Sequence, residues 1–422
     1  LVVKFSWPSE QKRGLEPRIY EVSQSDFGTP IHLISFEVVS PNGSAWSNAH
    51  FLPTTSQIST ARTGKLFDKK KNAIEENPER RSMWATTFVG IGESLEECVS
   101  AWDLCECLLH ASFGWLSFYV KGYLHRDVSV GNILKIKNGP RQRTQFSTRS
   151  VQSLLGIDLD RKQADAPVSN PSDASKVLRD GVSQLEIGRD RFWEDLSTAL
   201  KKTISSDDKT SEAKYVHQNC VVEKAKELEE LAQEFKITTV CKAFLSDCDM
   251  AAELKGYFEG NKHEGSLSGT AEFMNQSLRR AVEEQLSYLQ SPVDDMYSFL
   301  WTALWCTLFN THECGESIQE KQWRKELQGS LSDRVSVLTE VVKGGTEKIK
   351  TISSIVRDMI PLLRDWKKSL DDLSIEWKEE WPKVEEGEAD EKLLVFHRFA
   401  FCGILNFTEL VKRYEPQLRS TE

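Results

Sequence analysis

The stretch Tyr123–Leu134 reads YLHRDVSVGNIL and carries the strongest functional signal in the chain. His125, Arg126 and Asp127 are consecutive, and Asn132 follows Asp127 five positions later. Apolar residues flank this core on both sides, so both ends of the segment are expected to be buried. A short loop that is fixed at both ends can direct the carboxylate of Asp127 and the amide of Asn132 toward one cleft.

This pair of side chains suits phosphoryl transfer. The reaction needs a carboxylate that orients the attacking hydroxyl group and accepts its proton, and it needs oxygen ligands for Mg²⁺ beside the triphosphate. The string H-R-D-x-x-x-x-N also matches the catalytic loop of protein kinases. Such a loop predicts further parts of a phosphate-binding site, in a fixed order along the chain.

Two of those parts lie upstream of the loop. The opening residues LVVKFSW place Lys4 in a strand-like run, Leu1–Phe5, where a lysine can contact nucleotide phosphates. A glutamate on the following helix is expected to pair with this lysine. Glu16 is the first candidate and Glu21 is the second.

Three more parts lie downstream. The segment AFLSDCDMA supplies Asp247 after an apolar run, as expected for a metal-binding aspartate at the end of a strand. SGTAEFM contains Thr270 in a Gly-Thr element that is expected to close the activation segment. Asp295 precedes Met296–Phe309, a run without charged residues that is too short to cross a bilayer and predicts a buried core helix.

The strings VVKFSWP…RGLE, GYLHRDVSVGNIL, FLSDCDMA, SGTAEFM and DDMYSFLWTALWC resemble the fungal-type protein kinase family. In that family the catalytic loop commonly reads H-R-D-I-S-x-G-N-I-L and the metal motif L-I-D-F-D-L-A. The resemblance implies an α+β, two-lobed, protein-kinase-like fold. It implies a truncated, β-rich N-terminal lobe (1–92) and a large helical C-terminal lobe (93–422) that carries an insertion (138–240).

The resemblance also implies ATP and Mg²⁺ in the cleft between the lobes. Lys4 would hold the α- and β-phosphates, and Glu16 would position Lys4. Asp127 would be the catalytic base, and Asn132 and Asp247 would be the Mg²⁺ ligands.

Four residues would support this site. Asp295 would brace the backbone of the catalytic loop from the helix below it, and His125 and Thr270 would be structural. Arg126 would pair with a phosphate in the activation segment, for which Ser266, Ser268 and Tyr257 are the available acceptors.

Four features depart from the kinase pattern. The Gly-rich strand–turn–strand that covers the phosphates is expected to lie upstream of Leu1. Ser129 stands where Ser/Thr kinases usually carry a lysine, although it agrees with the fungal family. Cys248 and Asp249 replace the Phe and Gly of D-F-G, and Asn275 stands where the family usually has Ala.

The insertion separates Asn132 from Asp247 by 115 positions (247 − 132), whereas both residues should face one cleft. The insertion is expected to contain its own helices, including one with an apolar stripe over Val221–Phe235. The segment Lys135–Arg149, with five basic residues and no acidic one, is expected to be an exposed loop. The insertion is either passive or a docking module.

The composition limits the remaining choices. The 422 residues are 39% hydrophobic, which excludes wholesale disorder, and the net charge of −10 gives no reason to expect a nucleic-acid partner. Nine scattered cysteines favour a reducing, intracellular environment, in the cytoplasm or the nucleus. Neither a secretory signal nor a membrane span is expected, and the oligomeric state stays open.

The leading hypothesis is therefore an ATP- and Mg²⁺-dependent protein kinase that phosphorylates Ser or Thr of a protein substrate. A small-molecule kinase of the aminoglycoside or choline type is a second possibility, because it shares the Asp-x-x-x-x-Asn arrangement. A pseudokinase that binds partners without catalysis is the third. The presence of Lys4, Asp127, Asn132 and Asp247 together argues against it.

Overall fold

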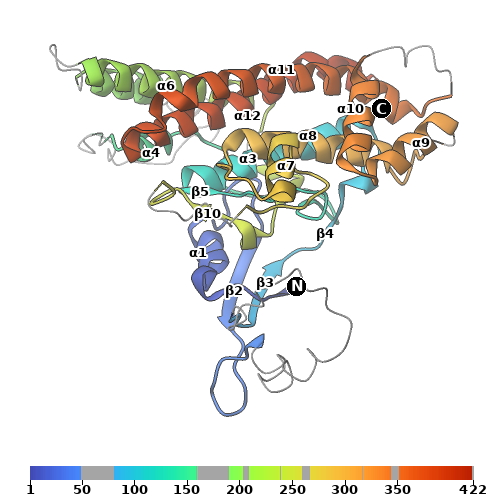
Figure 1. Ribbon diagram of the computed structural model, residues 1–422, viewed down its shortest axis with the longest axis horizontal. Helices are drawn as coiled ribbons and strands as arrows, with labels where there is room; N and C mark the ends of the chain where they lie inside the picture. Colours follow the sequence, from blue (N-terminus) through green and yellow to red (C-terminus); the bar gives the residue numbers. More distant parts are fainter. Residues whose placement is uncertain are drawn as a thin grey trace, which may run out of the picture.

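The chain has a mixed α+β fold, which confirms the expected α+β class (Figure 1). A small sheet with one helix lies at one end, and the other end is built almost entirely of helices. The residues that this computed structural model describes are 1–48, 80–157, 159, 190–202, 209–237, 239–258, 267–315, 317–343 and 351–420.

The small sheet is antiparallel, with the strand order β1-β3-β2. Its strands are β1 (Val2–Ser6), β2 (Ile31–Glu37) and β3 (Trp84–Val89), and β1 confirms the strand expected around Lys4. Helix α1 (Leu15–Val22) packs against β2. Ile19 and Tyr20 of this helix are buried in the core.

The alternation of side chains along β1 directs Lys4 inward. Lys4 lies opposite Thr86 of β3, whose side chain is buried, whereas Val3 and Phe5 are exposed on the other face of the sheet. Because successive side chains of a strand point to opposite faces, the lysine faces the rest of the molecule.

Two helices form the centre of the larger part: α3 (Ala101–Val120) and α8 (Pro292–Leu308). Helix α8 starts with a capping box, in which Ser291 and Asp294 satisfy each other's backbone N–H groups, and with Pro292 in its first turn. Nearly every residue of α8 is buried, which confirms the core helix expected from its uncharged sequence.

A second sheet, β4-β6-β9, joins the two ends of the insertion. β6 (Ile133–Ile136) pairs with β9 (Ala243–Leu245), so that Ile133 lies opposite Leu245. Asn132 precedes β6 and Asp247 follows β9. This register therefore brings the two residues together despite the long insertion between them.

The insertion is not a separate excursion but part of the common core. Its helix α6 (Lys209–Glu234) packs along α12 (Ala389–Arg419), as the two long helices in Figure 1 show. Val221, Ala225 and Leu228 of α6 are fully buried in the same apolar cluster as α3 and α8.

The expectation of an exposed loop over Lys135–Arg149 is wrong in part. Arg143 is buried and donates a hydrogen bond to the carbonyl of Thr29 at 3.2 Å. Phe146 stacks on Phe113 of α3 with 4.2 Å between ring centroids. The polar composition of this segment gave no sign that an arginine and a phenylalanine within it anchor the start of the insertion to the core.

The remaining elements are short strands and further helices. Their bounds are η1 Glu10–Lys12, β4 Gly92–Ser94, η3 Leu95–Glu97, β5 Tyr123–Leu124, β7 Arg141–Gln142, α4 Val151–Leu154, β8 Val240–Cys241, η4 Cys248–Met250, β10 Ala252–Glu253, α7 Gln276–Glu284, α9 Ile318–Leu327, α10 Leu331–Lys343 and α11 Ser354–Val384.

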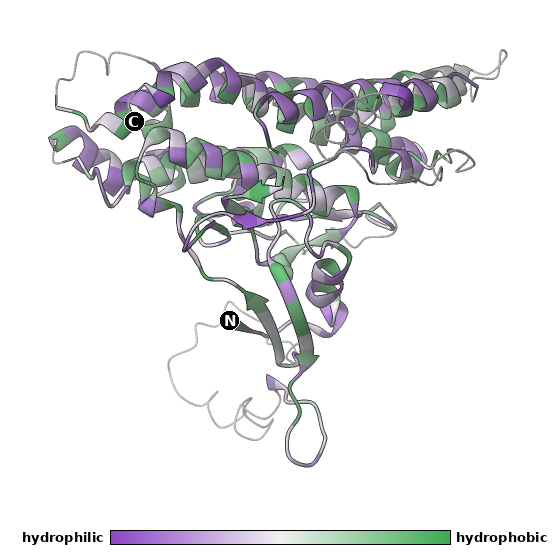
Figure 2. Cartoon of the chain, turned by 180° about the vertical axis from the view of Figure 1, so that it is seen from behind, coloured by the Kyte–Doolittle hydropathy of each residue, from purple (hydrophilic) through white to green (hydrophobic). Residues whose placement is uncertain are grey.

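The long helices at the top of the molecule are amphipathic. Figure 2 shows hydrophilic residues along their outward side and hydrophobic residues toward the interior. Within the described residues, one helix, α12, is long and apolar enough to cross a membrane. However, 78% of its most apolar window is buried inside the molecule, as in the core helix of a soluble protein.

Candidate active site

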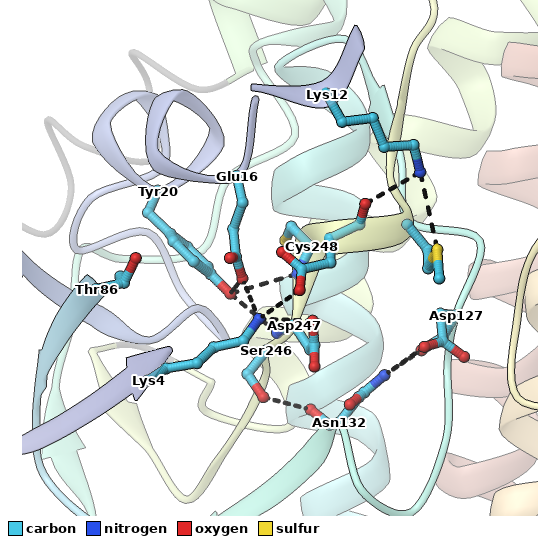
Figure 3. A network of polar contacts seen from close by, with 12 residues as sticks. Lys4, Lys12, Glu16, Tyr20, Thr86, Asp127, Asn132, Ser246, Asp247 and Cys248 are labelled. Atoms are coloured by element: carbon cyan, nitrogen blue, oxygen red, sulfur yellow. Dashed lines mark hydrogen bonds and ion pairs between the residues drawn. The ribbon is translucent and has the colours of Figure 1, made fainter. Parts of the chain in front are cut away.

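A cluster of charged side chains lies where the small sheet and α1 meet the segment after β9. The ammonium nitrogen of Lys4 is 2.7 Å from Glu16 Oε1, 2.7 Å from Asp247 Oδ1 and 3.3 Å from Asp249 Oδ2 (Figure 3). Of the two glutamates expected to pair with Lys4, Glu16 therefore makes the contact. Glu21 lies on the exposed side of α1.

Mutual attraction controls the charges in this cluster. Burial opposes the charged form of Lys4, but the carboxylates of Glu16, Asp247 and Asp249 outweigh it and raise the pKa of Lys4 above its usual value. Burial raises the pKa of Glu16, and Lys4 works against that shift. One lysine thus balances three carboxylates, which leaves the cluster negative and suited to a further cation.

Tyr20 fixes the position of Asp247 and was not predicted from the sequence. Its hydroxyl group donates to Glu16 Oε1 at 2.9 Å and accepts from the backbone N–H of Asp247 at 2.9 Å. Asp247 has a φ of 62°, a left-handed conformation that non-glycine residues adopt rarely. Tyr20 follows Glu16 by four positions, so their shared helix face was the signal available in the sequence.

His125 holds the loop that carries Asp127 against the segment before Asp247. Its Nε2 lies 3.0 Å from the carbonyl oxygen of Ser246, and its Nδ1 lies 3.3 Å from the backbone N–H of Asp127. A carbonyl only accepts and an N–H only donates, so the ring is neutral and carries its proton on Nε2. Burial lowers the pKa of His125, in agreement with this state.

The side chains of Asp127 and Asn132 face each other within the loop. Asn132 Nδ2 donates to the backbone carbonyl of Asp127 at 2.7 Å and to Asp127 Oδ2 at 3.0 Å. The other oxygen of Asp127, Oδ1, accepts from the backbone N–H of Thr270 at 2.6 Å and from its hydroxyl group at 2.8 Å. The Gly-Thr element thus orients the carboxylate, while the amide nitrogen of Asn132 is used within the loop.

Asp295 supports the loop from the N-terminal end of α8. Its Oδ2 accepts from the backbone N–H of Arg126 at 3.0 Å and from the indole nitrogen of Trp115 at 2.8 Å. Gln290 adds a second anchor, because it accepts from Arg126 Nε at 3.0 Å and donates to the carbonyl of Arg126 at 3.1 Å. Neither Trp115 nor Gln290 was singled out in the sequence.

Two of the three phosphate acceptors expected for Arg126 are buried. Tyr257 donates its hydroxyl hydrogen to the carbonyl of Gln290 at 2.8 Å, and Ser268 is only 9% exposed. Either residue needs a local opening before it can be modified, and the pairing of Arg126 with a phosphate in this segment stays a prediction. Ser266 lies outside the described residues.

Ser129, Cys248 and Asn275, which differ from the kinase pattern, each have defined hydrogen-bond contacts. Ser129 is 3% exposed, and its carbonyl accepts from the backbone N–H groups of Asn132 and Ile133. Cys248 is buried and its backbone N–H lies 3.4 Å from the hydroxyl oxygen of Tyr20. Asn275 caps α7 by accepting from the backbone N–H of Leu278 at 2.7 Å, a task that Ala cannot perform.

The site offers oxygen ligands of the kind that Mg²⁺ prefers. Carboxylate oxygens of Glu16, Asp247 and Asp249 lie within 4.8 Å of one another. Asp249 Oδ1 is buried without a hydrogen-bond partner among the described residues. The amide nitrogen of Asn132 bonds Asp127, so the amide oxygen is the atom that Asn132 can offer to a metal ion, and this donor set fits a hard divalent cation.

No protein-family model matches the chain, and no curated protein matches its sequence.

Proposed function

We propose that this protein is an ATP- and Mg²⁺-dependent protein kinase with a two-lobed, kinase-like fold. The residues 1–92 would form the partial N-terminal lobe, 93–422 the C-terminal lobe, and 138–240 the insertion within it. One observation supports this most: Lys4, Glu16 and Asp247 meet within direct hydrogen-bond distance, although they come from β1, α1 and the segment after β9. A chance collection of polar residues has no reason to repeat this order and this pairing.

The second half of the site supplies the acid–base chemistry. Asp127 accepts the proton of a Ser or Thr hydroxyl group while the hydroxyl oxygen bonds to the γ-phosphorus and the bond from that phosphorus to ADP breaks. Thr270 donates twice to Asp127 Oδ1, which uses both lone pairs of that oxygen, whereas Oδ2 accepts from Asn132 alone and keeps a second lone pair for the proton. Asp127 therefore stays available as a base while its direction is fixed.

Lys4 and Glu16 bind rather than react. Glu16 holds Lys4 in place. When ATP binds, Lys4 gives up its contact with Asp247 and contacts the α- and β-phosphates instead. Asp247 and Asn132 would hold Mg²⁺, which neutralises charge on the phosphates when bound. Glu16 is 4% exposed and bonds Lys4 at 2.7 Å, so it positions Lys4 from inside the protein.

The nine cysteines, all within the described part of the chain, are free thiols, which supports an intracellular protein. The substrate is proposed to be a protein. The small-molecule kinase is the weaker alternative, because the Gly-Thr element bonded to Asp127 belongs to the protein kinase pattern.

The proposal is tested by transfer of the γ-phosphate from labelled ATP to Ser/Thr peptide libraries. Asp127→Asn is expected to lower the rate by about 10²–10⁴-fold, the usual contribution of a general base. Asp195→Asn is the matched control, since Asp195 is exposed and far from the site in sequence. Equal incorporation by wild type and Asp127→Asn excludes Asp127 as the base, and no incorporation by wild type favours the pseudokinase.

A further inference from the structure

A second lysine reaches the same cluster from the small sheet. Lys12 ends η1, which connects β1 to α1, so it lies between Lys4 and Glu16 in the chain. Its ammonium group donates to the carbonyl of Asp249 at 3.0 Å and lies 3.8 Å from Met250 Sδ. The carboxylate of the same Asp249 is 3.3 Å from Lys4, so both lysines converge on one residue.

The site needs a second cation for phosphoryl transfer. Glu16, Asp247 and Asp249 surround Lys4, and Asp127 adds a fourth carboxylate nearby in the loop. A triphosphate brings further negative charge, which accumulates on the transferred group and its leaving oxygen in the transition state. Ser129 cannot balance this negative charge, because its hydroxyl group is neutral and its side chain is buried.

The view in Figure 3 shows how Lys12 approaches. Its side chain extends from η1 toward the segment after Asp247, and its ammonium end points to the side of the site on which Asp127 lies. Lys12 is half-buried, so part of this residue stays in contact with solvent. The ammonium group of Lys12 donates to the Asp249 carbonyl and to Met250 Sδ, both neutral acceptors, and it can exchange such bonds for the stronger charge-assisted bonds of a phosphate group.

We infer that Lys12 binds the γ-phosphoryl group of the nucleotide and provides the positive charge that Ser129 does not provide from the catalytic loop. This inference rests on the proposed function. Lys4 serves the α- and β-phosphates, and Lys12 serves the group that is transferred. Because Lys12 comes from η1 and bonds the segment after Asp247, its contact also holds the two sides of the cleft at a fixed separation.

A purely structural role of Lys12 makes a different prediction. If the hydrogen bond between Lys12 and Asp249 only stabilises the structure, it acts whichever nucleotide is bound. Its loss then lowers the affinities for ATP and for ADP to the same degree. A γ-phosphoryl ligand acts only on ATP. The ratio of the two affinities therefore separates the two roles.

The experiment measures equilibrium binding of ATP and of ADP, each with Mg²⁺, to the full-length protein. Lys12→Met is expected to lower the affinity for ATP about 10-fold and the affinity for ADP less than about 2-fold. The loss for ATP corresponds to one charge-assisted hydrogen bond. Lys12→Arg keeps the charge and is expected to retain most of the ATP preference. Arg13→Met is the matched control, because Arg13 is the next residue but binds Glu10 and Glu37 away from the cluster.

Each outcome has one meaning. If Lys12→Met loses affinity for ATP and ADP equally, or loses none, the inference is overturned. The proposed function still stands in that case, provided that wild type binds ATP. Wild type that binds neither nucleotide overturns the proposed function, and the inference with it. Thermal melting of each variant checks folding, and Lys12→Gln replaces Lys12→Met if the latter unfolds.

Discussion

The carboxylate of Asp295 accepts a hydrogen bond from the backbone N–H of Arg126 at 3.0 Å, although 169 positions separate the two residues. Arg126 has a φ of 70°, which is unfavourable for a residue with a side chain. The buried start of α8 thus holds the loop in a strained conformation, and this conformation sets the direction of Asp127. Strain of this kind persists only where the surrounding structure enforces it.

This arrangement predicts a pH effect on stability. Burial raises the pKa of Asp295 from 3.8 to about 7. Because the folded state then binds a proton that the unfolded state has released, the free energy of unfolding falls as pH rises from about 4 to about 7, by up to about 4 kcal/mol. Asp295→Asn cannot ionise, so this part of the slope is expected to disappear in urea unfolding measured across that range.

The control for this pH effect is Asp372→Asn, which changes an exposed aspartate on α11 in the same way. Its pH profile is expected to parallel that of wild type. If Asp295→Asn also parallels wild type, Asp295 is not the group that titrates.

Tyr20→Phe tests how Asp247 is positioned. The variant removes the hydroxyl oxygen that accepts from the backbone N–H of Asp247, and it leaves that N–H without its partner. The expected loss in the free energy of unfolding is about 1–3 kcal/mol. Chemical denaturation measures it, with Tyr215→Phe as the control because Tyr215 is half-buried. Equal stability of Tyr20→Phe and wild type would show that the hydroxyl group does not hold Asp247.

Lys4→Met leaves three carboxylates within 4.8 Å of one another without their lysine. Their mutual repulsion destabilises the folded state once they are ionised, so the variant is expected to lose stability as pH rises from about 4 to about 8. The melting temperature relative to wild type should therefore fall more at pH 8 than at pH 5. Lys137→Met changes an exposed lysine and should show no such trend. The account of the cluster is wrong if the two variants behave alike.

Deleting the insertion is expected to unfold the protein rather than to leave a trimmed enzyme. The buried residues of α6 each stabilise the fold by about 1–3 kcal/mol, and together they approach the 5–15 kcal/mol of a whole domain. They are Val221, Val222, Ala225, Leu228 and Ala232. Circular dichroism should show no cooperative melt for a chain that joins residue 142 directly to residue 240. A cooperative melt near that of wild type identifies the insertion as a removable module.

Local patterns were enough to predict much of the fold. The strands around Lys4, the buried helix after Asp295 and the apolar stripe of α6 all follow from the spacing of apolar residues, and the structure contains each of them. Such patterns depend on neighbours in the chain, which is why they can be read without coordinates.

The contacts between distant segments were not predictable in the same way. The sequence left Glu16 and Glu21 as alternatives, and only the packing of α1 decides between them. Gln290 and Trp115 bond the catalytic loop through their positions on other elements, and no local spacing marks them. Arg143 was expected in solvent because its neighbours are polar, yet a carbonyl of a distant turn satisfies it.

We propose that Lys4, Asp247 and Asn132 gather around a magnesium-bound triphosphate. Titration of ATP into the protein, with and without Mg²⁺, is the decisive measurement. Mg²⁺ is expected to tighten ATP binding by about 10-fold or more in wild type and not in Asp247→Asn, while Asp372→Asn behaves as wild type. ATP binding that is absent, or that is the same with and without Mg²⁺ in wild type, would contradict it.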